Sequence, residues 1–572
     1  MSVDRRFQLG LAASLVVTLA GVASCNGPRR STPDASPDAG PDEGPPPVVD
    51  SLWPADARSR EAIPGPFLVE STVPASSEWG VACEAPLEVS LNRDVDAASI
   101  TPATFTVNSK GGAVTGSFTV SGSKIVFQPK ALLPVLQPVT ATLTTGVLDT
   151  KGTPLWGPYS WTFGCDSRWS APVWVSDMST LSVSPEVSLA DGGSAIVVWF
   201  AGKDGTLIGS IAFSRCDVST GSCTVPETLG TDVYGFDLAG NGAGQAIVVG
   251  RGTSSLWSRE FDPATKSWRP ASVVASSCLD GRNFLDVSMD GLGNATVIWR
   301  EHGLEQDEIN VRRYAWEASA WEPATVLDSS PLEAIQVRVA ENSGGTAIAL
   351  WGLADNGIQG SLMASRNGGQ GWTKPTRVAA ERPETKFSLD IDQAGNAIVV
   401  WAEHAAASPG IWSSRLAAGT AAWTAPFKMD TMCCSSLPFV AMNAGGKALV
   451  AWMMASPIMA LWTRRYDPGT DAWTAPLYFR APKTLDGYPA LTMDPDGNAT
   501  VAWYQIVPPS TSAAHVMRFY DGPSQWGPMV QLSGGKGSPS AFAVDSNAAG
   551  QVVLASQEAA SGFSAIFVAF LR

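Results

Sequence analysis

Three histidines occur in the 572 residues, and two of them follow a glutamate in the same sequence context. Each Glu-His pair comes shortly after the tryptophan that ends a repeated apolar segment. Such a pair could transfer protons or supply metal ligands. A zinc site needs three or four convergent ligands, however, and the pairs belong to the third and fifth copies of the repeat, which are not neighbours. We expect either an echo of the repeat or a role in ligand binding, with these candidates: Glu301, His302, Glu403, His404 and Tyr504.

Other signs of catalysis are missing from the sequence. It contains no serine nucleophile elbow, phosphate-binding loop or HExxH zinc motif. The 38 basic and 53 acidic residues give a net charge of -15, which argues against nucleic-acid binding because that affinity rests on Lys and Arg. We therefore expect no catalytic residue, no metal and no cofactor.

The composition favours short strands and tight turns. Only 16% of the residues are charged, whereas 55 are Gly, 41 are Pro and 22 are Trp. With 45% hydrophobic residues the chain can build a large core, and its length indicates two to four domains or one long repeat array.

The first 24 residues have the features of a secretory signal. Two arginines precede an apolar run over residues 9–22 that is short for a membrane span. Residues 22–25 read Val-Ala-Ser-Cys, which resembles a bacterial lipobox. The resemblance implies cleavage before Cys25 and acylation of this cysteine, so that several acyl chains hold the protein on a lipid bilayer. An ordinary signal peptide with an incidental cysteine is the alternative. Asn26 is not the aspartate of the inner-membrane retention signal, which favours an outer-membrane lipoprotein that faces the periplasm or the cell surface.

Residues 25–50 are predicted to be a stalk. They include PDASPDAGPDEGPPP and have almost no large apolar side chains, so they cannot form a core. Proline-rich segments are extended and semi-rigid, which would hold the folded part away from a membrane.

Residues 51–165 contain short alternating runs bounded by Gly, Asn, Asp or Pro, a pattern typical of a β-sandwich. The segments VSLNRDVDAASITPATFTV, GSKIVFQPKALLP, TLTTGVLDTKGTPL and YSWTFGC resemble, in this order, the SbsA-type bacterial Ig-like domain. The resemblance covers roughly residues 80–165 and implies a spacer or adhesion module without catalytic residues.

Residues 166–572 contain two motifs that recur about every 50 residues. The first is a strand, a Gly-containing turn and a second strand, as in VSMDGLGNATVIW (287–299) and LTMDPDGNATVAW (491–503). The second is Trp followed two or three residues later by Pro, with Cys223 and Pro226 in one copy. Each motif occurs eight times, and the region opens with the second motif and closes with three strands. We predict an eight-bladed β-propeller, closed by pairing of its N- and C-terminal strands, with seven blades as the alternative.

Two resemblances accompany the repeat. Residues 365–372 (SRNGGQGW) resemble the Asp-box of sialidase-type propellers, a turn that stabilises the fold and carries no activity. The turns DPGTDAW and DPATKSW loosely resemble those of eight-bladed quinoproteins, which also carry a vicinal disulfide such as Cys433-Cys434 would form. An arginine recurs in most third strands, and because residues repeated once per blade cannot converge on one site we expect these arginines to be structural or solvated. We expect the repeated tryptophans to pack between blades, with a carbohydrate-stacking platform as the alternative.

Cysteine spacing suggests disulfides in an exported chain. Cys83 and Cys165 bracket the Ig-like segment, a short turn separates a second pair, and a third pair is adjacent in sequence. Unpaired thiols are the alternative in each case. The candidates are Cys83, Cys165, Cys216, Cys223, Cys433 and Cys434, which leaves Cys278 odd.

Taken together, these features predict an all-β protein: an Ig-like β-sandwich followed by a β-propeller. We expect a membrane-anchored, non-catalytic binding or scaffold protein whose propeller face recognises a protein or a glycan through its loops. The loops to examine first are 300–310, 402–410, 429–437 and 504–514. The alternative is an enzyme, either a polysaccharide hydrolase or lyase or a quinoprotein, with its acid–base groups clustered at one end of the channel.

Overall fold

A computed structural model describes residues 65–572 except 136, 167–168, 177–180, 203–207, 277–283, 304–305, 356–358, 380–382, 404–408, 431–434, 455–459, 481–488, 508–510, 533–536 and 561–562. The described residues form strands and one short 3-10 helix, η1 (Ala97–Ser99), so the prediction of an all-β chain is confirmed. None of the helical structure described is long and apolar enough to cross a bilayer. The predicted signal, Cys25 and the predicted stalk lie outside the described residues.

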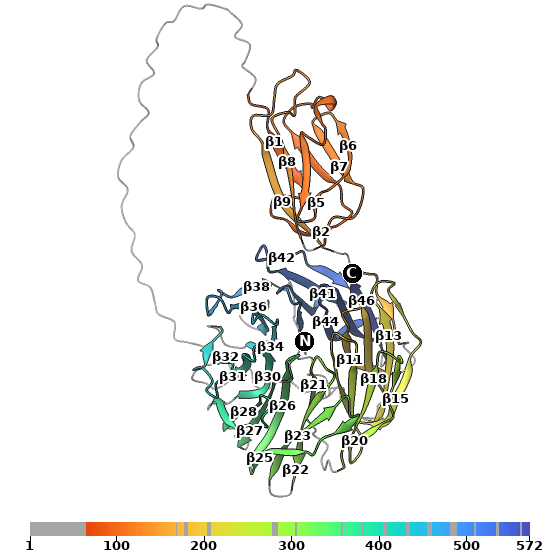
Figure 1. Cartoon of the computed structure of the whole chain (residues 1–572), viewed down its shortest axis with the longest axis vertical. Helices are drawn as coiled ribbons and strands as arrows, with labels where there is room; N and C mark the ends of the chain where they lie inside the picture. Colours follow the sequence, from red (N-terminus) through yellow and green to blue (C-terminus); the bar gives the residue numbers. More distant parts are fainter. Residues whose placement is uncertain are drawn as a thin grey trace, which may run out of the picture.

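Two sheets pack face to face in the Ig-like segment, drawn in orange in Figure 1. The first has the order β1 (Val69–Val73), β3 (Leu87–Leu91), β7 (Lys124–Pro129), β6 (Gly116–Ser121). The second has the order β2 (Trp79–Ala82), β9 (Tyr159–Asp166), β8 (Pro138–Leu143), β4 (Phe105–Ser109), β5 (Gly112–Ala113).

One buried cluster fills the space between these sheets, and its alternating strand residues explain the period-two pattern of the sequence. Leu87, Val89 and Leu91 of β3 point into it, while the residues between them do not. The Cys83–Cys165 disulfide lies in the same cluster, so the expected pairing of these two cysteines is present.

Beyond Asp166, the described strands fall into eight successive antiparallel units, each beginning with one copy of the repeated hairpin; the first and the eighth unit are joined in one nine-stranded sheet by a single parallel pair, Leu181 with Ser564. The first four units, numbered in chain order, are the following. Unit 1 is β11 (Leu181–Leu189), β12 (Ser194–Gly202), β13 (Gly209–Asp217), β14 (Ser222–Cys223) and β15 (Glu227–Val233). Unit 2 is β16 (Gly235–Gly240), β17 (Ala246–Arg251), β18 (Leu256–Asp262), β19 (Ser267–Trp268) and β20 (Ser272–Ala275). Unit 3 is β21 (Leu285–Met289), β22 (Ala295–His302), β23 (Asp307–Ala315), β24 (Ala320–Trp321) and β25 (Thr325–Ser330), and unit 4 is β26 (Glu333–Glu341), β27 (Ala347–Asp355), β28 (Gln359–Asn367) and β29 (Thr376–Ala379).

The remaining units follow the same plan. Unit 5 is β30 (Pro383–Ile391), β31 (Ala397–Glu403), β32 (Gly410–Leu416) and β33 (Phe427–Lys428); unit 6 is β34 (Ser435–Met442), β35 (Ala448–Met454), β36 (Ala460–Asp467), β37 (Ala472–Trp473) and β38 (Leu477–Arg480); unit 7 is β39 (Ala490–Met493), β40 (Ala499–Val507), β41 (Thr511–Tyr520), β42 (Gln525–Trp526) and β43 (Val530–Leu532); unit 8 is β44 (Ser538–Ser546), β45 (Val552–Ala560) and β46 (Phe563–Leu571).

Unit 8 receives its outer strand from the start of the repeat region. The short strand β10 (Val173–Trp174) pairs antiparallel with β46, with Val173 opposite Val568 and Trp174 opposite Phe567. The first strands of consecutive units contact one another, and the first strand of unit 8 contacts that of unit 1. Figure 1 accordingly shows the blue sheet of unit 8 beside the yellow sheet of unit 1. The repeat region is therefore propeller-like, with the strand offset that the order of the motifs predicted.

The hydrophobic core of this region lies between the units rather than inside them. Each buried cluster of the described repeat residues combines side chains of two neighbouring units, and one cluster joins unit 8 to unit 1. The six repeated tryptophans on the second strands are buried in these junctions. They are Trp199, Trp299, Trp351, Trp401, Trp452 and Trp503. The interpretation that these tryptophans pack between blades is confirmed.

Unit 2 explains one departure from the repeat. Its second strand carries Gly250 at the position where six of the other seven copies have Trp, and Trp257 stands opposite Gly250 on the third strand. A Cβ added to Gly250 would lie 2.3 Å from the Trp257 ring, so the ring occupies the space that this glycine leaves. In unit 2 the aromatic ring at this junction therefore comes from the third strand instead of the second, and it packs against unit 1.

Candidate functional site

The turns of the repeated hairpins gather at one end of the units. Each of the eight turns contains a glycine with positive φ, which L side chains rarely adopt. Three residues before that glycine stands Asn or Asp in seven of the described turns, and Ala190 in unit 1. The Asx side chain accepts hydrogen bonds from backbone N–H groups of its own turn, as Asp290 does from Leu292 and Asn294. The Asx side chain therefore caps the hairpin turn.

Two kinds of joint alternate between these turns. Asparagines in units 2, 4, 6 and 8 donate through Nδ2 to a backbone carbonyl of the next unit's turn. The pairs are Asn241 to Asp290 (3.0 Å), Asn342 to Asp392 (3.0 Å), Asn443 to Pro495 (2.9 Å) and Asn547 to Ala190 (3.1 Å). Units 1, 3 and 5 instead use a backbone N–H, as Gly291 does toward the Ser343 carbonyl (3.1 Å).

A cavity of about 210 Å³ opens among these turns, and its lining residues come from all eight units. At or near this cavity, buried carboxylates on the first strands accept hydrogen bonds from backbone N–H groups of the first strand of the next unit. Because an inner edge strand has unpaired backbone groups, these bonds satisfy donors that would otherwise be stranded. The pairs are Asp237 with Val287 (2.6 Å), Asp286 with Val339 (2.5 Å), Asp390 with Met442 (2.7 Å) and Asp545 with Leu189 (2.8 Å).

Glu341 is the most perturbed carboxyl near this cavity. Its side chain is fully buried between units 3 and 4, where it pairs with Arg313, and Arg313 also donates to Asp290 (2.7 Å). Oε2 of Glu341 is buried without a hydrogen-bond partner. Burial raises the pKa of Glu341 to about 7, although Arg313 opposes this shift.

At the opposite end of unit 3, His302 belongs to a compact polar cluster. Nδ1 of His302 lies 2.6 Å from Oδ1 of Asp307, and the imidazole is about half exposed (48%) while Asp307 is buried. Asp307 also pairs with buried Arg300 (Nε–Oδ2 2.9 Å) and accepts the Ala334 N–H (2.8 Å). Nη2 of Arg300 also lies 3.2 Å from Nδ1 of His302, so one ring nitrogen faces both the guanidinium and the carboxylate.

The structure does not bring the four described sequence candidates together in one site. Glu301 and His302 end the second strand of unit 3, and Glu403 ends that of unit 5, where it is buried. Tyr504 packs into the junction of units 7 and 8, 6.3 Å from the Phe542 ring. His404 lies outside the described residues.

Sequence reasoning missed Asp307 and Arg300. Arg300 lies between Trp299 and Glu301, and the only sequence signal for Asp307 was its place at the start of the following strand. Nothing in the spacing indicated that both would be buried beside His302.

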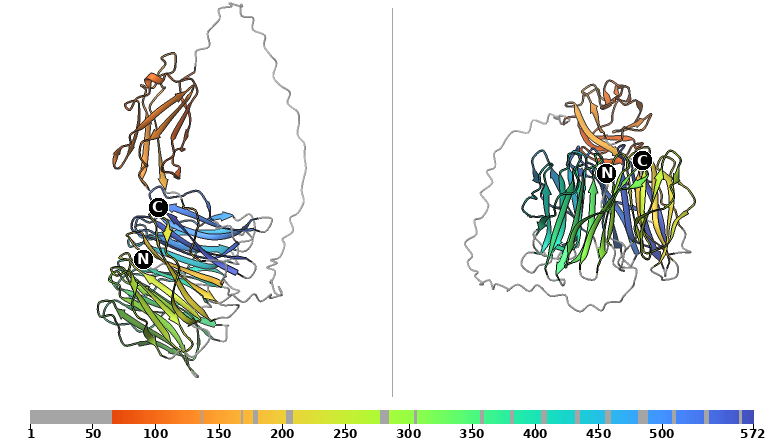
Figure 2. Two further views of the ribbon diagram at one scale, coloured as in Figure 1. Left: turned by 90° about the vertical axis from the view of Figure 1, so that its right-hand side faces the viewer. Right: turned by 60° about the horizontal axis from the view of Figure 1, so that its bottom comes forward.

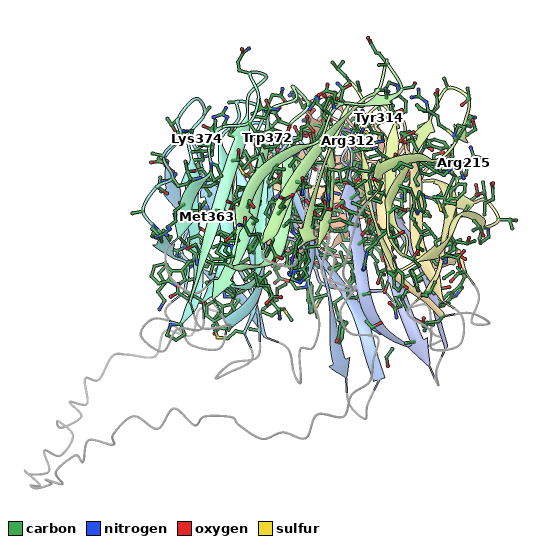
Figure 3. All side chains as sticks on the ribbon, turned by 90° about the horizontal axis from the view of Figure 1, so that it is seen from below. Arg215, Arg312, Tyr314, Met363, Trp372 and Lys374 are labelled. Atoms are coloured by element: carbon green, nitrogen blue, oxygen red, sulfur yellow. A yellow bond between two sulfur atoms is a disulfide. The ribbon has the colours of Figure 1, made fainter. Side chains whose placement is uncertain are left out.

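The recurring arginines reach neighbouring units. Arg259, Arg312 and Arg464 donate to carbonyl groups on the outer part of the preceding unit: Leu229 (3.2 Å), Val274 (2.6 Å) and Met429 (2.9 Å). Figure 3 shows Arg215 and Arg312 toward the same end of their sheets as Trp372. The structural role expected for these three arginines is confirmed.

The turn that resembles an Asp-box also has a structural role. Oδ1 of Asn367 accepts the Gly369 N–H (2.9 Å), and Asn367 forms a bridge with Trp372. Such a turn caps the end of a sheet and offers no reactive group.

The Ig-like sheets contact unit 7 at the turn end of the repeat region, as the right-hand view of Figure 2 shows. Tyr520 donates to Oδ2 of Asp166 (2.7 Å), and its ring lies 5.7 Å from that of Trp79. Gln525 donates to the Ser77 carbonyl (2.6 Å). Burial, and then the Asp166 carboxylate, raise the pKa of Tyr520, so this phenol remains a donor at physiological pH. The end of the repeat region that carries His302 therefore faces away from the Ig-like domain.

Cysteines and metal ligands complete the survey of candidate residues. The Cys216–Cys223 disulfide is present in the first unit, whereas Cys433 and Cys434 lie outside the described residues. No group of three or more His, Cys, Asp or Glu within the described ranges is placed to hold a metal ion.

These features define an all-β protein with an Ig-like domain and a propeller-like repeat region. Residues 64–165 match the model of the bacterial Ig-like domain. No curated protein matches the chain in sequence.

Solved structures to which this chain is similar include the WD40 domain of SCAP from fission yeast, with 10% identity over 71% of this chain and 94% of that one and a TM-score of 0.42. Polysaccharide lyase Uly1 has 7% identity over 70% and 92% of the two chains and a TM-score of 0.37. The Hadza microbial sialidase Hz136 has 10% identity over 86% and 94% of the two chains and a TM-score of 0.31.

Proposed function

We propose that this chain is an exported, lipid-anchored binding protein without catalytic activity. In this proposal an Ig-like domain carries a closed propeller. The far face of the propeller, which is the end that carries His302 and lies away from the Ig-like domain, recognises a protein or a glycan. The lipobox-like segment that ends at Cys25 supports export and lipid anchoring, and the two disulfides are consistent with an oxidising compartment.

Closure into eight blades is part of the proposal. Three observations support it: β10 completes unit 8, each junction between neighbouring units has its own buried cluster, and Asn547 of unit 8 bonds to unit 1. A closed ring has no exposed sheet edge at its ends, which removes a route to aggregation.

The observation that carries the binding role is how the repeats use their buried polar groups. Asp237, Asp286, Asp390 and Asp545 each hold the backbone of a neighbouring unit, and the arginines do so at the outer part. These bonds give each of the four carboxylates a structural role that needs no substrate. They make a rigid frame, and the Ig-like domain occupies its turn end, so recognition falls to the far end.

Recognition is tested with the full chain purified in detergent. We expect it to bind a defined component in a glycan array or in a pull-down from an envelope extract. Substitutions of exposed side chains in the segment 300–310, such as His302 and Gln306, should abolish this binding and leave the thermal midpoint unchanged. Binding that survives all the loop substitutions would overturn the assignment to the far face.

The membrane address has a separate test. Metabolic labelling with an alkyne fatty acid should label the wild-type chain and the Cys278→Ser control but not Cys25→Ser. Equal labelling of Cys25→Ser would overturn the acylation of Cys25.

One observation favours a second candidate function, that of a polysaccharide-acting enzyme. In the His302–Asp307 pair a buried carboxylate orients a half-exposed imidazole, which is the arrangement of a general base. Release of reducing ends or unsaturated sugars from a polysaccharide panel by the wild type, and its loss in His302→Gln but not in Glu308→Gln, would support this function. The quinoprotein alternative rests on the turns DPGTDAW and DPATKSW and on Cys433 and Cys434, which lie outside the described residues.

A further inference from the structure

The junction between units 5 and 6 carries a row of aromatic rings that runs from the inside of a sheet to its rim. Trp452, Trp462 and Tyr478 are successive cross-strand neighbours on β35, β36 and β38. Their rings are stacked, with centroids 6.3 Å and 4.8 Å apart and planes inclined by 22° and 29°. The exposed fraction rises along the row from 0% to 8% to 43%, so the row ends in a half-exposed ring backed by two buried ones.

A second ring lies on the other side of this junction. Phe427 of β33 is 42% exposed, and the guanidinium carbon of Arg464 lies 5.0 Å from its centroid. Arg464 donates through Nη1 to the Met429 carbonyl (2.9 Å) and through Nε to the Thr474 carbonyl. These two bonds fix the guanidinium between the units and leave Nη2 to donate to a ligand.

The corresponding rows of other units end differently. In unit 3 the row runs from Trp299 through Asn310 to Val326, and in unit 2 it ends at Val273. In unit 4 its middle residue is Met363, which Figure 3 shows partway along the sheet. Packing between units is therefore satisfied without a ring at the outer position, so the aromatic ending of unit 6 calls for another explanation.

We propose that the rim of the junction between units 5 and 6 binds a pyranose residue of a glycan, with the sugar stacked on Tyr478. This inference rests on the proposed function as a binding protein, and it adds a contact at the rim to the recognition proposed for the far face. The electron-rich face of an aromatic ring attracts the C–H groups of a sugar's apolar face. Stacking on Trp462 holds the Tyr478 ring in place, which lowers the entropy cost of binding. Nη2 of Arg464 donates to a hydroxyl or carboxylate oxygen of the sugar.

The size of the site favours a sugar over a protein partner. Phe427 and Tyr478 together expose on the order of 200 Å². A stable protein interface needs about 800 Å² on each side. One or two sugar rings, in contrast, can be covered by two aromatic side chains and a fixed donor.

The test measures binding of two probes, the neutral cellohexaose and the acidic hexaguluronate, to the full chain in detergent. Tyr478→Val gives unit 6 the residue that unit 3 carries at this position, so it should fold. Leu477→Ala, on the opposite face of the same strand, and Val326→Ala are matched controls, and both native residues are exposed. We expect Tyr478→Val to weaken binding about tenfold or more and Phe427→Ala about threefold, with both controls unchanged.

The outcomes separate this inference from the proposed function. Binding of one probe with the expected losses supports the rim site, and the preferred probe shows whether Arg464 meets a hydroxyl or a carboxylate. Binding that Tyr478→Val leaves intact overturns the rim site while the proposed function stands. Absence of binding to both probes also overturns the rim site, and a positive pull-down would then keep the protein branch of the proposed function.

Discussion

The Ig-like domain and the repeat region bury their apolar residues in different places. The Ig-like domain has one cluster enclosed by its own two sheets and crossed by the Cys83–Cys165 disulfide. In the repeat region every cluster is shared by two units, so no unit has a complete core of its own. Stability is therefore local in the first region and belongs to neighbouring pairs in the second.

The largest expected loss of stability is confined to the Ig-like domain. Replacing Cys83 and Cys165 by alanine opens a link across 82 residues, which should cost about 4 to 5 kcal/mol in the chain-entropy model. Calorimetry of the full chain should show the Ig-like transition at lower temperature and the repeat transition unmoved. The Cys216–Cys223 disulfide spans only 7 residues, so the matched double variant Cys216→Ala/Cys223→Ala should lower the stability of the repeat region by about 2 kcal/mol. A shift of both transitions in the first variant would contradict local stability.

Trp452→Ala tests the shared cores. This buried ring touches residues of unit 5, so its loss should destabilise the repeat region by about 3 to 5 kcal/mol and leave the Ig-like transition in place. Trp156→Ala in the Ig-like domain is the control, because that ring is 77% exposed and should contribute less than about 0.5 kcal/mol. Chemical denaturation measures both, and equal losses would refute the distinction.

Glu341 gives the repeat region a pH dependence with a defined sign. Its folded carboxyl holds a proton up to about pH 7, whereas the unfolded group has a pKa of 4.5. As the pH rises through this window the unfolded chain releases the proton first, so stability is greatest below pH 4.5 and falls by up to about 3 kcal/mol.

Glu341→Gln should flatten this decline between about pH 5 and pH 8 relative to the wild type. The measurement is the free energy of unfolding of both proteins across that range. Arg313, Asp290 and Thr296 face the carboxyl, so a parallel decline in the two proteins would assign the effect to another group.

The smallest expected effect concerns the contact between the two regions. Tyr520→Phe removes the donor to Asp166 and leaves a buried carboxylate oxygen without that bond, at a cost of about 1 to 3 kcal/mol. Small-angle scattering should report a wider distribution of distances between the regions. Tyr159→Phe, on an Ig-like strand away from unit 7, should leave the scattering curve unchanged; a change in both would show that the contact does not set the orientation.

The repeat was predictable from the sequence because hairpin turns and strand alternation are local properties. The glycine and Asx positions of the turns, the Trp positions and the offset of the terminal strands could all be read from spacing. The interpretation of Cys83 and Cys165 rested on their positions around one segment, and the structure places them in a single bond.

Contacts between units could not be predicted in the same way. Asp307 is one acidic residue at a strand start, and only the packing of unit 4 against unit 3 buries it beside Arg300. Trp257 shows the same limit, since its role depends on the space that Gly250 leaves across the sheet. The Tyr520–Asp166 contact joins residues 354 positions apart, beyond the reach of any local pattern.

The alternation of joints around the turns has a consequence for how such a molecule can change in size. Asparagine amides join units 2 to 3, 4 to 5, 6 to 7 and 8 to 1, so the structural period is two units and not one. Inserting or deleting a single repeat would place two turns of the same kind side by side and interrupt this alternation. Growth by pairs keeps the alternation, which makes a tandem of two repeats the smallest segment whose duplication or loss leaves the order of the joints unchanged.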